Sequence, residues 1–327
     1  DASRLYVMRA QLQTTADAAA IAAVVEVNNA RPANATAVAL QYVPKNLVEQ
    51  TVATVTAGDV EPGKWDFSTN AFTKLGSWTD PAVAAVRVTA RYSGAYTFAR
   101  VFGATGQTVT ARAVGAIGYV SSSDCLRPWA VSYQTMLDVL YPPAGTKSPS
   151  YDLTPQDIQT LAAMSYPGNA ITLLDGTASP LTHGNISQVK VSSQNGNAGY
   201  RNSITGCADR VIGPGTILHG DPGVGSGQTK GPLKTFCDAN GGTTSQGAQK
   251  FTCDGQPKVK LVIWDQNNGG SGANLTVRVK YVGVFAITQF DGGGSTTQIS
   301  GFFSTMAATG SFSATPSPTT GSIALVQ

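Results

Sequence analysis

The sequence predicts an α+β protein in which one long N-terminal helix packs on an antiparallel β-sheet. Two observations lead to this prediction. Residues 1–25 contain neither Gly nor Pro, and their apolar side chains recur at spacings of three and four, which is the period of one face of an α-helix. Several later segments alternate between apolar and polar residues, which is the period of a strand with one buried face.

Toward the end of the predicted helix, the side chains on its apolar face become small. Its members are Leu5, Met8, Leu12, Ala16, Ala19 and Ala23. Alanine favours helix strongly but has little surface to bury, so this face lets another backbone approach closely. It suits either a sheet of the same chain or the same helix in a second copy.

Strand-like segments follow the helix along most of the chain. We expect strands over residues 47–56, 83–92, 107–119, 258–264, 273–280, 281–290, 298–304 and 322–326, and short strands near 170–174, 186–192 and 210–218. Residues 59–67 predict a turn and a short strand, and residues 36–43 and 96–103 predict short helices. Thr154 and Pro155 begin another helix, because Thr is a good N-cap and Pro fits the first helical position.

Changes in composition divide the chain into three parts. Residues 1–120 hold the long helix and the first strands, and the serines at 121–123 mark a boundary. Residues 121–257 are rich in Gly, Asn, Ser and Thr, which predicts a loop-rich insertion. Residues 258–327 return to strand patterns, and we expect these strands to complete the N-terminal sheet.

The four cysteines, Cys125, Cys207, Cys237 and Cys253, lack the close pairs of a zinc site. An even number of widely spaced cysteines suits two disulfides formed outside the cytoplasm. Three pairings are possible, and free buried cysteines are the alternative. The short loop between Cys237 and Cys253 favours that pair, which leaves Cys125 with Cys207.

Charge and hydropathy exclude two classes of partner. Charged residues make up 13% of the chain, about half the usual share, so copies repel one another weakly. The net charge is +3 and the basic residues are scattered, which argues against nucleic-acid binding. No run of 18 apolar residues occurs, so we expect no membrane span in this form.

No group of residues in the sequence predicts catalysis. His219 and Asp221 lie close in sequence, but no nucleophile elbow accompanies them, and His183 stands alone. The glycines of residues 223–231 resemble a phosphate loop, yet a Ser or Thr does not follow Lys230 and no helical pattern continues. We therefore expect a protein that is not an enzyme.

Calcium is the small ligand that the sequence supports best. Asp265 and Asn267 follow one predicted strand, and Asp291 follows another, both within Gly-rich loops. Such loops offer the oxygens that calcium prefers, although Asp, Asn and Gly are also ordinary turn residues. We expect no obligatory cofactor, with calcium as the candidate.

Several short segments resemble the TadE/TadG-like family of Flp/Tad pilus-assembly proteins. They are residues 3–6 (Ser-Arg-Leu-Tyr), 9–13 (Arg-Ala-Gln-Leu-Gln), 16–20 (Ala-Asp-Ala-Ala-Ala), 85–89, 98–103, 109–114, 200–206, 213–215, 299–303 and 323–326. The resemblance implies a pilin-like plan in a bacterial protein of the cell surface. Family members carry an apolar anchor before the first segment, and we expect it to be cleaved or to lie outside this sequence.

Together these observations predict a secreted or surface-exposed structural protein, the subunit of a filament or pilus-like assembly. Its partners would be copies of itself and pilus or envelope components. The expected contacts are the small-residue helix face and the apolar strands, with Val284 and Ile287 as their representatives, because an exposed strand edge can pair with another chain. The alternative is a monomeric secreted adhesin or carbohydrate-binding module stabilised by calcium.

Overall fold

The computed structural model describes residues 1–175, 185–194, 196–220, 226–267, 276–293, 297–305, 311–313, 316–318 and 322–326. It is an α+β protein with an N-terminal helix, largely antiparallel sheets and two disulfides. The chain forms two units. Unit 1 comprises Asp1–Tyr119, Thr154–Gln159 and Gly321–Gln327, and unit 2 comprises Val120–Leu153 and Thr160–Thr320.

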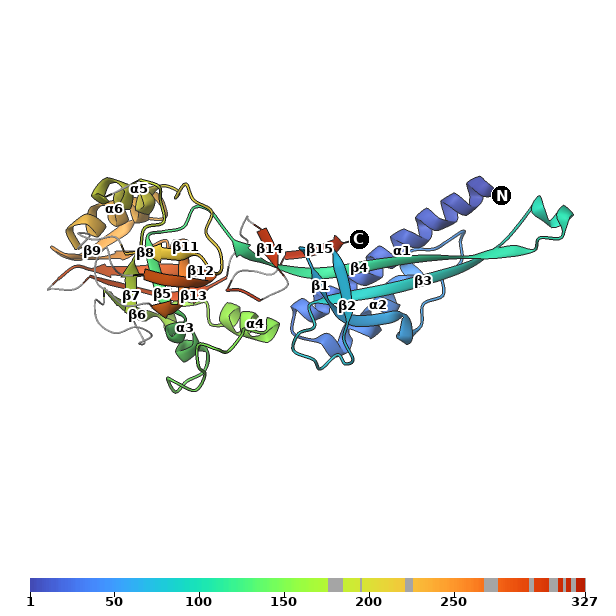
Figure 1. Cartoon of the computed structure of the whole chain (residues 1–327), viewed down its shortest axis with the longest axis horizontal. Coiled ribbons are helices and arrows are strands. Elements are labelled where there is room, and N and C mark those ends of the chain that lie inside the picture. Colours follow the sequence, from blue (N-terminus) through green and yellow to red (C-terminus); the bar gives the residue numbers. More distant parts are fainter. Residues whose placement is uncertain are drawn as a thin grey trace. The chain divides into compact units, whose positions relative to one another are not determined.

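Unit 1 is built on the long helix α1 (Ala2–Asn28), which confirms the predicted helix (Figure 1). Its other helices are α2 (Ala35–Tyr42) and the 3-10 turns η1 (Pro32–Asn34), η2 (Val43–Lys45), η3 (Ala57–Asp59) and η4 (Ala99–Phe102). Its strands are β1 (Val60–Asp66), β2 (Ala71–Lys74), β3 (Ala85–Ala95), β4 (Gly106–Ser122) and β15 (Ser322–Val326).

The strands of unit 1 pair in the order β4, β3, β1, β2, and β15 pairs with the other edge of β4. Every register between them is antiparallel. Helix α1 covers one face of this sheet, where a Cβ added to Gly115 would lie 2.7 Å from the carbonyl oxygen of Ala20. The small side chains of α1 therefore allow close contact between helix and sheet backbones, as their pattern predicted.

One local prediction in unit 1 is wrong, and another is met only in part. Residues 47–56 form isolated bridges and not a strand, because Glu49 and Gln50 have φ angles of 47° and 69° that reverse the chain in a tight turn. Residues 96–103 contain a helix that is shorter than predicted, the 3-10 helix η4, which ends at Gly103 (φ of 85°) as expected.

Unit 2 contains a sheet that has nine strands among the described residues. They are β5 (Trp129–Ser132), β6 (Ile171–Asp175), β7 (Asn185–Gln188), β8 (Ile217–His219), β9 (Thr243–Gly247), β10 (Lys250–Cys253), β11 (Lys258–Asn267), β12 (Thr276–Asp291) and β13 (Gln298–Ser304). The pairs β5–β11 and β6–β7 are parallel and the others antiparallel. A short strand β14 (Ser311–Ser313) pairs with β4.

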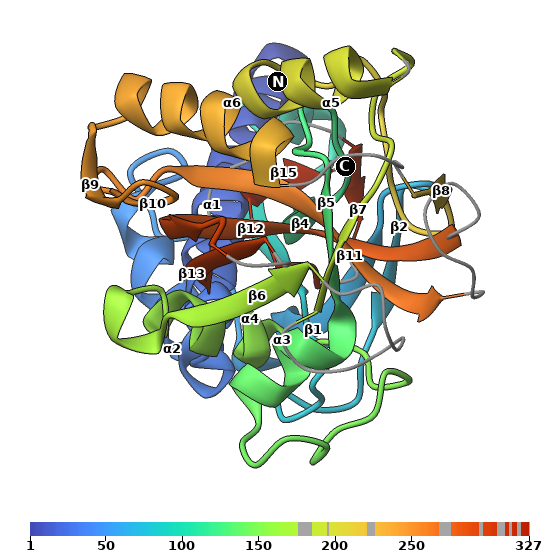
Figure 2. The ribbon, with the colours of Figure 1, turned by 90° about the vertical axis from the view of Figure 1, so that its left-hand side faces the viewer.

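Helices α5 (Gly196–Thr205) and α6 (Ser226–Ala239) lie on one side of this sheet and α3 (Tyr133–Leu140) on the other (Figure 2). Helix α4 (Pro155–Ala163) begins as predicted, with Asp157 accepting hydrogen bonds from the amide and hydroxyl of Thr154. The sequence did not predict α5 and α6, because their Gly, Asn, Ser and Thr residues have low helix propensity.

Both expected disulfides are present in unit 2. Cys125 bonds Cys207, and Cys237 of α6 bonds Cys253 of β10. The second bond ties an unpredicted helix to the sheet, where burial of Leu233 stabilises it further.

The strands of residues 258–304 join the sheet of unit 2. This arrangement differs from the expected three-part division, in which they completed the N-terminal sheet. Only β15, at the end of the chain, returns to unit 1. The expected insertion and the C-terminal strands therefore share one hydrophobic core, which includes Leu126, Val189, Trp264 and Val282.

Candidate functional site

The small-residue face of α1 lies inside unit 1. Met8, Leu12, Ala16, Ala19 and Ala23 are buried, and Leu5 is partly buried. Contacts with the sheet use this face within one chain, so it is not free to contact a second copy.

Val284 and Ile287 are also interior residues, contrary to the expectation that they sit on an exposed edge. Both are fully buried. Their strand, β12, is paired with β11 on one side and β13 on the other. The apolar run of β12 reflects burial on both faces of the sheet, so contact with another chain would require opening unit 2.

The calcium candidates do not form one site. Asp265 accepts two hydrogen bonds from Arg278, at 3.0 and 2.8 Å, near the start of β12. Asp291 ends the same strand, where Lys250 lies 3.3 Å away and the Gly293 amide donates a hydrogen bond. Among the described side chains, which do not include that of Asn267, no cluster of three or more metal-ligating residues occurs.

Of the histidines and the aspartate that suggested other chemistry, only His219 lies within the described residues. His219 ends the short strand β8, opposite Thr276, while His183 and Asp221 lie outside the described residues. The glycine-rich segment 223–231 does lead into a helix, α6, which the sequence analysis did not expect. Residues 221–225 lie outside the described part of the chain.

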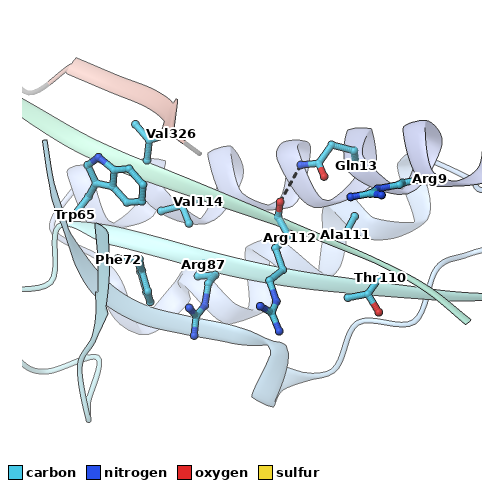
Figure 3. Close-up of a pocket in the computed structure, with 10 residues that line it drawn as sticks. All are labelled: Arg9, Gln13, Trp65, Phe72, Arg87, Thr110, Ala111, Arg112, Val114 and Val326. Carbon is cyan, nitrogen blue, oxygen red and sulfur yellow. Dashed lines mark hydrogen bonds between the residues drawn. The ribbon is translucent and has the colours of Figure 1, made fainter. Parts of the chain in front are cut away.

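Unit 1 has a hollow of about 640 Å³ beside β4, lined by residues of α1, β1, β2, β3, β4 and β15. Its apolar side is formed by Trp65, Phe72, Val114 and Val326 (Figure 3). Trp65 is 4% exposed and packs with Val114 in a small cluster. The side chains of β4 and β15 meet here because Val326 is paired with Val114.

Three basic side chains also line the hollow, together with Gln13, Thr110 and Ala111. Arg87 and Arg112 project from β3 and β4 toward the same side of the sheet, and Arg9 comes from α1 (Figure 3). Arg87 lies 4.6 Å from the centre of the Phe72 ring. Arg9 and Arg112 have no acidic partner among the ion pairs of the described residues.

One carboxylate, that of Glu61, lies beside this basic group. It is 2.7 Å from Arg87 and 2.8 Å from Lys74. Burial alone would raise the pKa of Glu61, but hydrogen bonds from Lys74 and Arg87 outweigh it and hold the pKa below its ordinary value. Glu61 is therefore ionised at neutral pH, and the cations around it still outnumber it.

The free edge of β4 borders the hollow. Gln13 of α1 donates a hydrogen bond of 2.9 Å to the backbone carbonyl of Arg112 (Figure 3). β15 covers β4 only from Val114 to Gly118. Residues 106–113 pair with β3 on one side, and no described strand is registered with them on the other.

The turn between β3 and β4 carries exposed apolar side chains beside the start of α1. Phe98, Val101 and Phe102 are 75%, 84% and 90% exposed, and we call them the hairpin tip. Asp1 holds this turn by accepting hydrogen bonds from three consecutive amides, those of residues 97–99.

Arg4 supports the same region from the helix. It makes a bidentate ion pair with Glu49, with distances of 2.5 and 2.7 Å, and donates to the carbonyl of Ala95. Tyr6 and Val7 of α1 are 77% and 50% exposed. An apolar surface held in place by charged contacts is suited to binding a partner.

Sequence reasoning did not find either surface. The residues of the hairpin tip lie in the segment predicted as a short helix, and Trp65 lies in the short strand predicted within residues 59–67. The hollow joins residues that are more than 250 positions apart, Trp65 and Val326, so only their strand pairing brings them together. The one signal available was the pair of arginines, Arg87 and Arg112, within two strongly alternating strands.

Comparison with known proteins supports the resemblance for the start of the chain. Residues 1–30 match a family model described as "Putative Flp pilus-assembly TadE/G-like". No curated protein and no solved structure matches the chain. Within the described residues, no helix combines the length and apolar content needed to cross a membrane.

Proposed function

We propose that the chain is a non-catalytic structural component of a pilus-associated assembly at the bacterial cell surface, where it repeats as a subunit. The match of residues 1–30 to the TadE/G-like pilus-assembly family carries this proposal. That segment contains the whole of α1, so the matching part is the helix around which unit 1 is built.

Two further properties support an extracellular assembly. Both disulfides suit an oxidising compartment, and the low content of charged residues reduces repulsion between copies. A helix packed on an antiparallel sheet is also the plan of pilins. This likeness is one of architecture alone, which does not fix function.

The hairpin tip, with Tyr6 and Val7, is the contact surface that the proposal uses. Full burial of a Phe or Val side chain contributes about 1.5–3 kcal/mol, so the tip can stabilise an interface strongly. Its backbone is fixed by Asp1, which lowers the entropy lost on binding.

Electron microscopy and sedimentation velocity over a range of concentrations test the proposal. We expect ordered polymers or oligomers from the native chain. A triple variant, Phe98→Ser, Val101→Ser and Phe102→Ser, should lose them. The matched control is Val211→Ser, because Val211 of unit 2 is also 70% exposed and lies outside the tip.

A monomer at the highest concentration, with no ordered particles, would refute assembly. If the triple variant still forms polymers, the contact between copies lies elsewhere than at the hairpin tip. Deletion of residues 1–25 is not a clean test, because it removes Met8, Leu12 and Ala16 from the core and would unfold unit 1.

A further inference from the structure

We propose that the free edge of β4 and the hollow beside it bind an extended, carboxylate-bearing peptide segment of another protein, added to the sheet as a strand. The site lies within unit 1 and does not depend on the hairpin tip. It therefore goes beyond the proposed assembly and can be tested separately from it.

The backbone of β4 offers hydrogen bonds at this edge. The amide of Ile117 donates to the carbonyl of Ala84, on the β3 side, at 2.8 Å. Because alternate residues of a strand direct their amides and carbonyls to opposite edges, the even-numbered residues face away from β3. Thr108, Thr110 and Arg112 thus direct their backbone groups toward the free edge, where the carbonyl of Arg112 already accepts a hydrogen bond from Gln13.

β15 shows how a strand occupies this edge. It pairs with β4 in antiparallel register from Gly118 to Val114, where Val326 is its last described residue. Residues 106–113 continue the same edge, and the hollow with its lining residues Thr110, Ala111 and Arg112 lies there.

The charges around the edge favour an acidic peptide segment as the bound strand. Arg9 and Arg112 have no acidic partner among the described residues. Arg87 and Lys74 share a single carboxylate, that of Glu61. Three arginines, Arg9, Arg87 and Arg112, thus line the hollow. The nearby carboxylates are those of Glu61, which pairs with Arg87, and Asp17, which accepts a hydrogen bond from Gln13. Carboxylates on an added strand would meet the arginines in charge-assisted hydrogen bonds.

Trp65 gives an independent indication of a ligand. Its side chain is 96% buried, since 4% is exposed, and it lines the hollow. Its Nε1 has no hydrogen-bond partner in the described part of the chain. Buried donors are normally satisfied, so an acceptor from a bound segment, a carboxylate or a carbonyl, would complete this group.

The same charges disfavour the symmetric alternative. Two copies that joined their β4 edges would bring Arg9 and Arg112 of one copy close to those of the other. Like charges at paired strands are destabilising. An acidic segment of a different protein therefore suits this edge better than a second copy of it.

Fluorescence anisotropy with labelled octapeptides tests the proposal on the whole chain. An octapeptide that alternates Glu and Val should bind, and a matched peptide with Lys in place of Glu should not. The double variant Arg9→Glu and Arg112→Glu should weaken binding of the Glu peptide at least about tenfold, or about 1.4 kcal/mol. Arg100→Glu is the control, because this exposed arginine does not line the hollow.

Amide hydrogen exchange by NMR distinguishes an added strand from mere charge attraction. The Glu peptide should protect the amides of Thr108, Thr110 and Arg112 in the native chain. Thr110→Pro removes one of these donors and should weaken binding, and Trp65→Phe should do so by removing the unpaired N–H group. The arginine variants keep the test valid if either of these fails to fold.

Four results would overturn the proposal, and the first three concern the peptides. They are equal binding of the Glu and Lys peptides, binding that the double arginine variant leaves unchanged, and binding without protection of the three amides. A fourth is an oligomer of the chain that Thr110→Pro dissociates while the peptide does not bind, since the occupant would then be a second copy. None of these results bears on polymers formed through the hairpin tip.

Discussion

Substitution of Gly115 by Ala tests the contact that holds α1 on the sheet of unit 1. The added Cβ would lie 2.7 Å from the carbonyl oxygen of Ala20 and 2.8 Å from Cγ1 of Val24. Both distances are shorter than ordinary van der Waals contact, and the first involves backbone, which cannot rotate away. Overpacking of this kind costs about 1–3 kcal/mol.

The expected loss of folding stability corresponds to a measurable fall in the melting temperature, Tm. Unfolding entropy of about 2.1 cal/mol/K per residue, over the roughly 130 residues of unit 1, gives about 0.27 kcal/mol/K. A cost of about 2 kcal/mol should therefore lower the Tm of unit 1 by about 7 °C. Differential scanning calorimetry measures the shift, and hydrogen exchange of peptides from residues 1–119 assigns it to unit 1.

Gly76→Ala is the matched control for this experiment. Gly76 also belongs to unit 1, but an added Cβ there meets no atom within 4 Å. Its Tm should stay unchanged or rise slightly, because alanine restricts the unfolded chain. If Gly115→Ala melts like the control, the close approach between α1 and β4 is not what holds the helix in place.

Two further predictions concern stability. The pKa values of Glu49, Asp59 and Glu61 lie below their ordinary values in the folded chain. The ion pairs of these carboxylates with Arg4, Lys74, Arg87 and Arg91 therefore stabilise unit 1 above about pH 4.5. Their contribution is lost as the pH falls through the folded-state pKa values of the three carboxylates. Urea denaturation should show lower stability at pH 3 than at pH 7, and equal stability would contradict this reasoning. Replacing Cys125 and Cys207 by Ser opens a loop of 82 residues, whereas the Cys237–Cys253 loop spans 16. Loop-closure entropy gives about 4.5 kcal/mol for the first and about 3 kcal/mol for the second, so the first variant should show the larger fall in the free energy of unfolding, and the reverse order would show that loop entropy does not dominate.

The sequence predicted those elements whose patterns are set by local burial. α1, β3 and β4 follow from their periodicity, because each has one face against a partner. The start of α4 follows from Thr154 and Pro155, which act within a single turn. Disulfide pairing followed from the short loop between Cys237 and Cys253.

The remaining elements depend on tertiary contacts that no local pattern reveals. α5 and α6 have poor helix formers and are stabilised by buried Tyr200 and Leu233, so the environment overrides propensity. Val284 and Ile287 illustrate the opposite failure. Their apolar run correctly predicted a strand, but sequence alone could not show that its neighbours belong to the same chain.

A contact surface must be sought among residues that remain exposed after the fold is complete. Here two such surfaces differ in physical character: the hairpin tip is apolar, whereas the β4 edge is lined by arginines. Salt screens exposed charges, with a Debye length of about 10 Å at 0.1 M and about 3 Å at 1 M, but does not weaken burial of Phe98 and Phe102. Assembly through the tip should therefore persist in 1 M salt while peptide binding at the edge is lost, and parallel loss of both would show that they share one electrostatic surface.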